Sequence, residues 1–97
     1  MTKPAYMVVD ARSSDPERMA EYRRLAQAAV EKFGGRYLVR GSPYTTLEGT
    51  WQPQRLVVLE FPGMDAARTF YDSPEYAVAR RARAGVSDFD MLLAEGY

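Results

Sequence analysis

The sequence is 97 residues long, enough for one domain with a single core and too short for a separate cofactor-binding domain. We therefore expect residues 1–97 to form a single domain. The 13 basic and 13 acidic residues cancel, so no net charge attracts nucleic acid or an anionic membrane, and neither is expected as a partner. Cysteine and histidine are both absent, which removes disulfides, thiolate nucleophiles, imidazole bases and the usual ligands of zinc, copper and haem iron. No metal or cofactor is expected, and acid–base chemistry must use Asp, Glu, Tyr, Lys or Arg.

The N-terminal residues lead directly into an apolar, strand-like run, without the apolar stretch and cleavage site of a secretion signal. No segment approaches the length of apolar residues that is needed to span a bilayer. A cytoplasmic protein is therefore expected.

The first predicted element is a strand over residues 5–9, where consecutive side chains are apolar. Successive side chains alternate between the two faces of a strand, so this pattern predicts a strand covered on both faces. Asp10 follows at the end of this strand.

A helix is predicted next, over residues 14–33. Ser14 and Glu17, three positions apart, fit a capping box at its start. Apolar residues then recur at spacings of three and four on one stripe, and Arg23 falls outside it. Two consecutive glycines end the helix, because glycine readily adopts the left-handed conformation. The apolar stripe consists of Met19, Tyr22, Ala26, Ala29 and Phe33.

A second strand is predicted over residues 36–40, followed by a segment rich in turn-forming residues over 41–53. Within that segment, residues 44–48 could resume the strand. Residues 41–53 are the part of the chain for which the sequence pattern gives the weakest prediction of secondary structure.

Residues 55–62 form the most strongly apolar strand of the sequence. Leu56 and Val58 point to one face, and Val57, Leu59 and Phe61 point to the other. Such a strand must be covered on both faces, as in the strand over 5–9.

The rest of the chain predicts a helix broken in two and a last strand. The helical pieces cover residues 65–72 and 73–85, with Ser73 as the cap of the second piece and proline in its first turn. The last strand is predicted over residues 90–95.

The order of elements is strand, helix, strand, strand, broken helix, strand, which predicts an α+β, ferredoxin-like βαββαβ fold with a four-stranded antiparallel sheet. Its first and third strands, the two that are apolar on both faces, should lie at the centre. The helices suffice to cover one face, so we expect a second copy of the protein to cover the other and form a dimeric α+β barrel. Each large side chain buried on that second face contributes roughly 1.5–3 kcal/mol.

Three stretches also resemble a known family. They are KFGGRYLVRG over 32–41, LEGTWQPQRLVVLEFP over 47–62 and FYDSPEY over 70–76. In this order they are similar to the bacterial family called domain of unknown function 1330. The resemblance implies membership of the dimeric α+β barrel group, whose relatives include cofactor-free monooxygenases, small-ring isomerases and haem enzymes. It implies no particular activity, since one fold carries many.

Four charged residues lie on or beside otherwise apolar strands: Arg40, Glu48, Arg55 and Glu60. Unpaired charges are costly there, so one interpretation is that they pair with one another across the strands or across the dimer. The other is an anion-holding pair of arginines, with a carboxylate as base. Asp10 could likewise be a general base or simply a polar strand end.

Aromatic residues near the chain breaks are the candidate binding residues. Tyr71, Ser73 and Tyr76 surround the break in the last helix, where they act either as cap and core or as part of a ligand cleft. Tyr44 and Trp51 lie in the turn-rich segment, and Trp51 is either a lid or an interface anchor. If a site exists, we expect it where the strands carrying Arg40 and Arg55 meet the helix break.

Two classes of function remain open. The protein is either a small cofactor-free enzyme of the isomerase, cyclase or monooxygenase type, acting on a small apolar carbonyl or carboxylate compound, or a non-catalytic ligand-binding or assembly protein. In the enzyme, Arg40 or Arg55 would stabilise an enolate while Glu48 or Asp10 moves the proton. A carboxylate beside an arginine in a large apolar cavity would favour the enzyme, and a solid core would favour the alternative.

Overall fold

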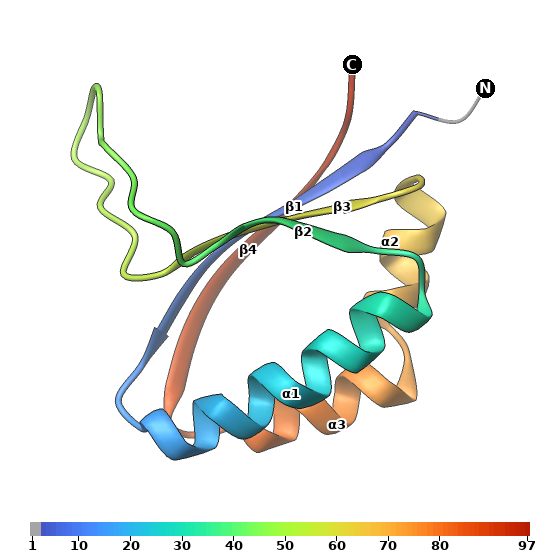
Figure 1. Ribbon diagram of the computed structural model, residues 1–97, viewed down its shortest axis with the longest axis horizontal. Helices are drawn as coiled ribbons and strands as arrows, with labels where there is room; N and C mark the ends of the chain where they lie inside the picture. Colours follow the sequence, from blue (N-terminus) through green and yellow to red (C-terminus); the bar gives the residue numbers. More distant parts are fainter. Residues whose placement is uncertain (1–2) are drawn as a thin grey trace.

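The computed structural model describes residues 3–97. Four antiparallel strands form one sheet in the order β2-β3-β1-β4, and the helices lie on one face of it (Figure 1). This is the predicted ferredoxin-like βαββαβ arrangement. No helix within residues 3–97 is long and apolar enough to cross a membrane. The elements are β1 (Ala5–Ser13), α1 (Pro16–Lys32), β2 (Arg36–Arg40), β3 (Leu56–Phe61), α2 (Met64–Tyr71), α3 (Pro74–Ala82) and β4 (Ser87–Glu95).

The two strands with apolar side chains on both faces pair at the centre of the sheet, as predicted. Val8 of β1 lies opposite Val58 of β3, and their pairing runs from Ala5 to Asp10 on β1. The segment 44–48 forms no strand, since it leaves the sheet altogether (Figure 1).

The strand β4 begins three residues earlier than predicted, at Ser87, and pairs with β1 along its whole length. Phe89 and Met91 alternate with the exposed Asp88 and Asp90. The prediction missed residues 87–89 because only one face of this stretch is apolar and Asp88 and Asp90 lie on the other, as in an ordinary half-buried strand.

The helix α1 is capped by Asp15, so the predicted capping box at Ser14 is wrong. The Asp15 carboxylate accepts a hydrogen bond from the Arg18 N–H at 3.1 Å. Pro16 takes the first helical position, which suits its fixed φ angle and places the cap on the residue before it.

The helix α3 is capped by Ser73, as predicted. The Ser73 hydroxyl accepts a hydrogen bond from the Tyr76 N–H at 3.1 Å and donates one to the Phe70 carbonyl at 2.7 Å. A single buried side chain therefore joins the end of α2 to the start of α3.

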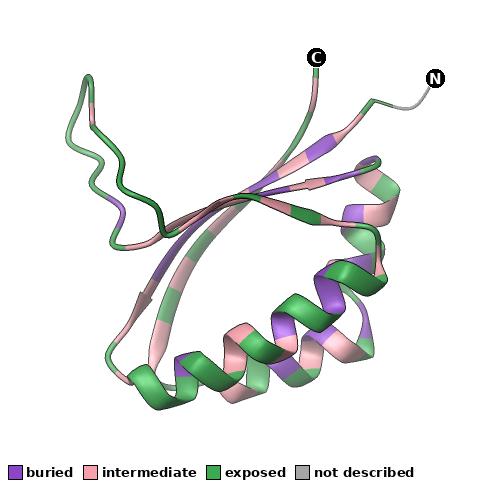
Figure 2. Cartoon of the chain, in the orientation of Figure 1, coloured by how far each residue is buried: buried purple, intermediate pink, exposed green. Residues whose placement is uncertain are grey.

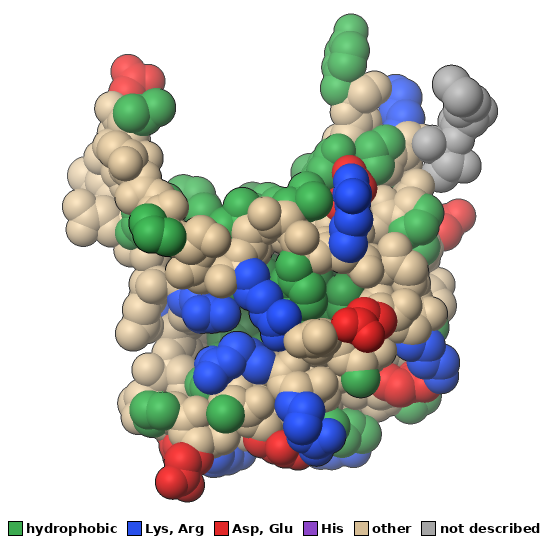
Figure 3. Space-filling view, viewed as in Figure 1, with side chains coloured by type: hydrophobic (Ala, Val, Ile, Leu, Met, Phe, Trp, Pro, Cys, Tyr) green, Lys and Arg blue, Asp and Glu red, His purple; other side chains and the backbone are tan. Residues whose placement is uncertain are grey.

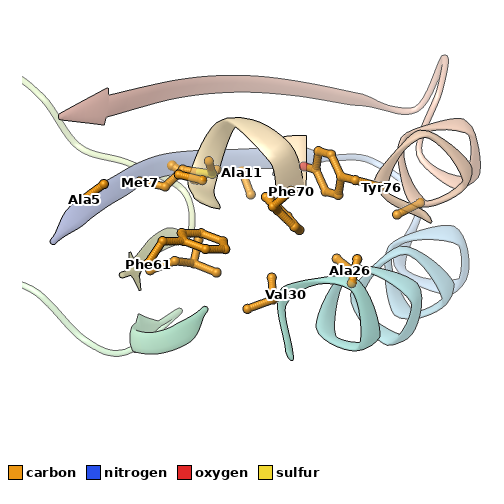
Figure 4. Close-up of a cluster of buried hydrophobic side chains, with 13 residues drawn as sticks. Ala5, Met7, Ala11, Ala26, Val30, Phe61, Phe70 and Tyr76 are labelled. Carbon is orange, nitrogen blue, oxygen red and sulfur yellow. The ribbon is translucent and has the colours of Figure 1, made fainter. Parts of the chain in front are cut away.

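The core lies between the sheet and the helices (Figures 2 and 4). Its largest fully buried side chains are Met7, Val30, Phe61, Phe70 and Tyr76. Phe70 packs against Phe61 and Tyr76, with ring centroids 5.1 and 4.6 Å apart. The core therefore joins the central strands to all three helices.

The opposite face of the sheet is uncovered in the single chain. One row of residues crosses all four strands there, namely Val39, Val58, Val8 and Leu92. Leu92 is 69% exposed. This row is apolar throughout, so the open face has a hydrophobic centre.

Ion pairs lie beyond this row. Arg36 pairs with Glu60 at 2.8 Å on one side. On the other side Arg12 contacts Asp90 at 3.1 Å and also Asp10. An apolar centre with charged groups around it is the usual anatomy of a protein interface.

An arm over residues 41–55 joins β2 to β3 and projects on the side of the sheet away from the helices (Figure 1). The Tyr44 hydroxyl donates to a carbonyl of the opposite limb at 2.7 Å, and the Thr46 hydroxyl donates to the Trp51 carbonyl at 2.8 Å. The Trp51 side chain remains 57% exposed. The arm therefore has internal hydrogen bonds but leaves its indole uncovered.

Candidate functional site

A small cavity of about 40 Å³ lies between the sheet and the helices. By the usual measure, this space holds a few water molecules or a small part of a ligand. Figure 3 shows basic side chains gathered around a hollow with hydrophobic atoms inside it. The apolar wall includes Met7, Val9, Leu59, Phe70, Phe89 and Met91.

Three arginines line this cavity from three different segments: Arg23 from α1, Arg40 from the end of β2 and Arg55 from the residue before β3. Arg40 pairs with Val57 in the sheet, and opposite residues of an antiparallel pair share a face. Arg40 is therefore on the face that the helices cover. We call these three residues the arginine cluster.

The positive charges of the arginine cluster are not balanced by neighbouring carboxylates in the described chain. Within residues 3–97, no carboxylate lies within 4.0 Å of the guanidinium of Arg23, Arg40 or Arg55. Burial, followed by the nearby charges of Arg23 and Arg40, lowers the pKa of Arg55 below its usual value. Like charges held together beside an apolar cavity favour an anion between them.

Neutral groups position two of these guanidinium groups. Arg40 lies 4.1 Å over the Tyr37 ring and donates a hydrogen bond to the Gln27 side-chain oxygen at 2.8 Å. The Gln27 amide in turn donates to the exposed Glu31 at 3.0 Å. The Arg55 guanidinium lies against the backbone of Gly41, where any larger residue would collide with it.

The predicted mutual pairing of the four strand charges is not found within the described chain. Glu60 pairs with Arg36 instead, because these two residues are opposite each other in the sheet. Within residues 3–97, Arg40, Arg55 and Glu48 have no ion-pair partner.

Two tyrosines from different helices meet in the wall of the cavity. The hydroxyl groups of Tyr22 on α1 and Tyr76 on α3 lie 2.7 Å apart and share a hydrogen bond. Burial, followed by proximity to Tyr76, raises the pKa of Tyr22 well above its usual value. The Tyr22 phenol is therefore protonated near neutral pH and cannot serve there as a base.

A groove of about 300 Å³ lies beside the cavity and shares part of its wall. Arg23, Arg55, Met19 and Ala11 line both spaces. A molecule too large for the cavity alone can therefore extend along this groove while still touching two arginines.

Asp10 is not part of the cavity. Its neighbours Val9 and Ala11 line the cavity, so the Asp10 side chain is on the opposite face of the sheet. There the buried Asp10 carboxylate accepts hydrogen bonds from the Gln54 N–H, at 3.0 Å, and from Arg12. The structure therefore separates this predicted base from the arginines by the thickness of the sheet.

The predicted residues of the turn-rich segment also lie outside the cavity. Glu48 and Trp51 are exposed on the arm, and Tyr44 uses its hydroxyl to hold the arm together. The arm projects away from the helices, so Trp51 does not cover the cavity of its own chain (Figure 1). The lid interpretation of Trp51 therefore has no support within the single chain.

Of the three residues predicted around the helix break, one lines the cavity. Tyr76 lines it, whereas Tyr71 packs beside Tyr76 with ring centroids 5.6 Å apart. Ser73 is fully engaged as the cap of α3. Within the described chain, Tyr71 and Ser73 do not line the cavity, so Arg40 and Arg55 share it with the first turn of α3 and not with the break itself.

Sequence reasoning missed Arg23, Tyr22 and Tyr37 as site residues. Arg23 follows Met19 by four positions and precedes Ala26 by three, so it borders the apolar stripe of α1. That spacing was the available signal for its partial burial. No group of acidic residues within residues 3–97 is arranged to hold a metal ion.

The family model described as domain of unknown function DUF1330 matches residues 4–97. The chain belongs to this family. The match covers the cavity, the arginine cluster and the open face of this DUF1330 protein. None of the curated proteins matches its sequence significantly.

Solved structures share the fold of this DUF1330 protein at low sequence identity. A protein of unknown function from Rhodopseudomonas palustris has a TM-score of 0.76 at 20% identity, covering 100% of this chain and 85% of that one. The cofactor-independent oxygenase SnoaB from Streptomyces nogalater has a TM-score of 0.65 at 14% identity, covering 99% and 95%. A dimeric ferredoxin-like protein of unknown function from Bacteroides fragilis has a TM-score of 0.63 at 14% identity, covering 96% of each chain. These similarities show the ferredoxin-like fold.

Proposed function

We propose that this DUF1330 protein binds a small, mainly apolar carboxylate or enolate between its sheet and its helices. The observation that supports it is the arginine cluster: Arg23, Arg40 and Arg55 border an apolar cavity without a carboxylate partner in the described chain. Arginine holds a planar oxyanion through two parallel hydrogen bonds, which suits a carboxylate or an enolate.

The charges explain why an anion should bind here. The pKa of Arg55 is lowered by its burial and by its two arginine neighbours, so the folded chain bears an unfavourable concentration of positive charge. A bound anion relieves that repulsion, and the apolar wall gains from contact with the rest of the ligand.

A cofactor-free enzyme of the isomerase, cyclase or monooxygenase type is the second candidate. It is favoured by the fold shared with SnoaB, which is described as a cofactor-independent oxygenase. The arginine cluster would stabilise an enolate in such a reaction. The cavity lacks the large volume and the carboxylate base that the enzyme was expected to have, because Asp10 and Glu48 lie elsewhere. Binding is therefore the better supported of the two.

We also propose that two chains pair through the open face of the sheet. The apolar row Val39, Val58, Val8 and Leu92 supports this, as does the description of a Bacteroides fragilis protein of the same fold as dimeric. The arm and the C-terminal end both project on this side of the sheet, one at each side of the open face (Figures 1 and 3). Trp51 would then contact the partner as an interface anchor.

The binding proposal is tested with pentanoate and its uncharged analogue pentanamide, followed by heteronuclear NMR titration of the labelled protein. We expect pentanoate to shift the amide signals of Arg23, Arg40 and Arg55 and of their neighbours. Pentanamide should bind at least about tenfold more weakly, since a charged hydrogen bond contributes roughly 1.5–3 kcal/mol.

The matched variants are Arg55→Met and Arg40→Met, with Arg24→Met as control. Arg24 is an exposed arginine of α1 that pairs with Glu21 and does not line the cavity. The first two variants should lose pentanoate binding and keep the fold. Equal binding of acid and amide, or equal loss in all three variants, would contradict the proposal.

A further inference from the structure

The hydroxyl groups of Tyr22 and Tyr76 have two hydrogens to donate, and only one of them has a protein acceptor in the described chain. They bond to each other at 2.7 Å, and this is the one hydrogen bond that either hydroxyl makes within residues 3–97. Each hydroxyl has one hydrogen to donate. One hydrogen is used in the pair, and the second has no protein acceptor in the described chain.

This second hydrogen is on whichever of the two hydroxyl groups accepts in the pair, and both groups lie in the wall of the cavity. Tyr76 is 1% exposed, and its side chain extends from α3 in among the core residues (Figure 4). Both tyrosines line the same cavity as the arginine cluster. A hydroxyl donor that lacks a protein acceptor and borders a cavity favours a ligand that provides an oxygen there.

The two tyrosines are held in place by their neighbours. The Tyr22 ring packs edge-on against Phe89, with centroids 5.4 Å apart, and the Tyr76 ring packs against Phe70 at 4.6 Å. The phenols therefore cannot turn far to find another acceptor. The raised pKa of Tyr22 keeps its hydroxyl protonated, so it remains a donor across the neutral range.

We propose that the ligand is a short oxo-carboxylate, with its carboxylate at the arginine cluster and its ketone oxygen accepting the unused hydrogen of the Tyr22 and Tyr76 pair. This rests on the binding function proposed above and adds the second anchor point. The cavity of about 40 Å³ restricts the part of the ligand inside it to a few heavy atoms. A carbonyl group at that end is both small enough and a good acceptor.

The test compares levulinate with pentanoate, which has the same chain length but a methylene in place of the ketone. We expect levulinate to bind the wild-type protein about 2- to 12-fold more tightly in an NMR titration, the range given by one net hydrogen bond. The double variant Tyr22→Phe, Tyr76→Phe should bind the two acids equally.

The double variant is the decisive one, because a single Tyr→Phe change leaves one hydroxyl that still has its hydrogen free. At least one of the two single variants should therefore keep the preference for levulinate. Replacing both partners of a hydrogen bond by apolar groups of the same shape is nearly neutral for stability, so the double variant should fold.

Three results would overturn the inference, and they separate it from the function on which it rests. If wild-type protein binds both acids equally, the tyrosine anchor is wrong and the arginine site stands. If the double variant still prefers levulinate, another donor is responsible. If neither acid binds the wild type, the anion site itself is wrong, and the tyrosine anchor fails with it.

Discussion

Two adjacent glycines after α1 have different physical reasons to be glycine. Gly34 has a φ of 81°, in the left-handed region that ends helices. Gly35 lies so close to Phe61 that a Cβ would be 2.6 Å from its ring. The helix stop is therefore made by the first glycine, and the second allows β2 to leave the helix directly over the core.

Arg12 and Arg55 have opposite electrostatic surroundings. Arg12 contacts the buried Asp10 carboxylate and the exposed Asp88 and Asp90. Arg55 has no carboxylate partner within residues 3–97, and its nearest charges are those of Arg23 and Arg40. Arg12 therefore belongs to an ion-pair network, whereas Arg55 is the central residue of the proposed anion site.

This difference predicts opposite effects on stability. We expect Arg55→Met to leave the melting temperature of the unliganded protein unchanged or to raise it by a few degrees, because it removes repulsion with Arg23 and Arg40 and adds an apolar side chain. Arg12→Met should lower it, since the buried Asp10 then loses its cationic partner. Differential scanning calorimetry at low salt measures both.

A loss of several degrees in Arg55→Met, as large as that in Arg12→Met, would mean that Arg55 is a structural ion-pair residue. It would then have a carboxylate partner across the dimer. The arginine cluster would lose its central member as an anion site.

At the scale of elements, hydrogen bonds from side chains hold the helical layer together. Arg18 on α1 donates to the carbonyl of Ala82, at 2.9 Å, in the last turn of α3. Ser73 joins α2 to α3, and the hydroxyl pair of Tyr22 and Tyr76 joins α1 to α3. The wall of the cavity is thus positioned by contacts between helices as well as by the sheet.

The caps of the helices give a prediction at this scale. Ser73→Ala should lower the free energy of unfolding by about 1–2 kcal/mol, because it leaves the buried Tyr76 N–H without its acceptor. Ser14→Ala, at the position where the sequence pattern had placed a cap, should change it by less than about 0.5 kcal/mol. Urea denaturation of the two variants makes the comparison.

Similar losses in both serine variants would show that α1 is capped in solution by Ser14. No loss in Ser73→Ala would show that water replaces the serine hydroxyl, in which case the junction of α2 and α3 is more open than the structure has it.

For the whole molecule, the open face is the feature that a single chain leaves unsatisfied. Val8, Val58 and Val39 are only partly covered there, and Leu92 is largely exposed. If a second chain covers this face, the interface should exceed roughly 1,600 Å² in total, the standard size of a specific complex.

Leu92→Asp tests this pairing with little effect on the single chain, because the side chain is 69% exposed there. We expect wild-type protein to sediment at twice the chain mass of 11.0 kDa, and the variant to sediment at the chain mass. Val78→Asp, at an exposed apolar residue of α3, is the matched control and should stay dimeric. A wild-type protein that sediments as a single chain at micromolar concentration would refute the dimer.

The sequence alone determined the architecture, because strand and helix periodicity are local properties. Runs of consecutive apolar residues in 5–9 and 55–62 identified the two central strands and predicted a sheet with two faces to cover. The structure confirms the strand order and the single helical layer. The predicted start of β4 was wrong, because Asp88 and Asp90 interrupt the apolar residues of this strand.

The tertiary structure alone decided which polar residues meet. Arg40 and Arg55 were found from the sequence, since a charge in an apolar strand stands out, but Arg23 joins them only because α1 crosses the same face of the sheet. Asp10 lies on the other face of the sheet, because successive side chains of β1 point to opposite faces. Whether these side chains meet depends on the strand register and on the packing of α1 against the sheet. Both are set by contacts between residues distant in sequence, so no single segment could predict which residues form the site.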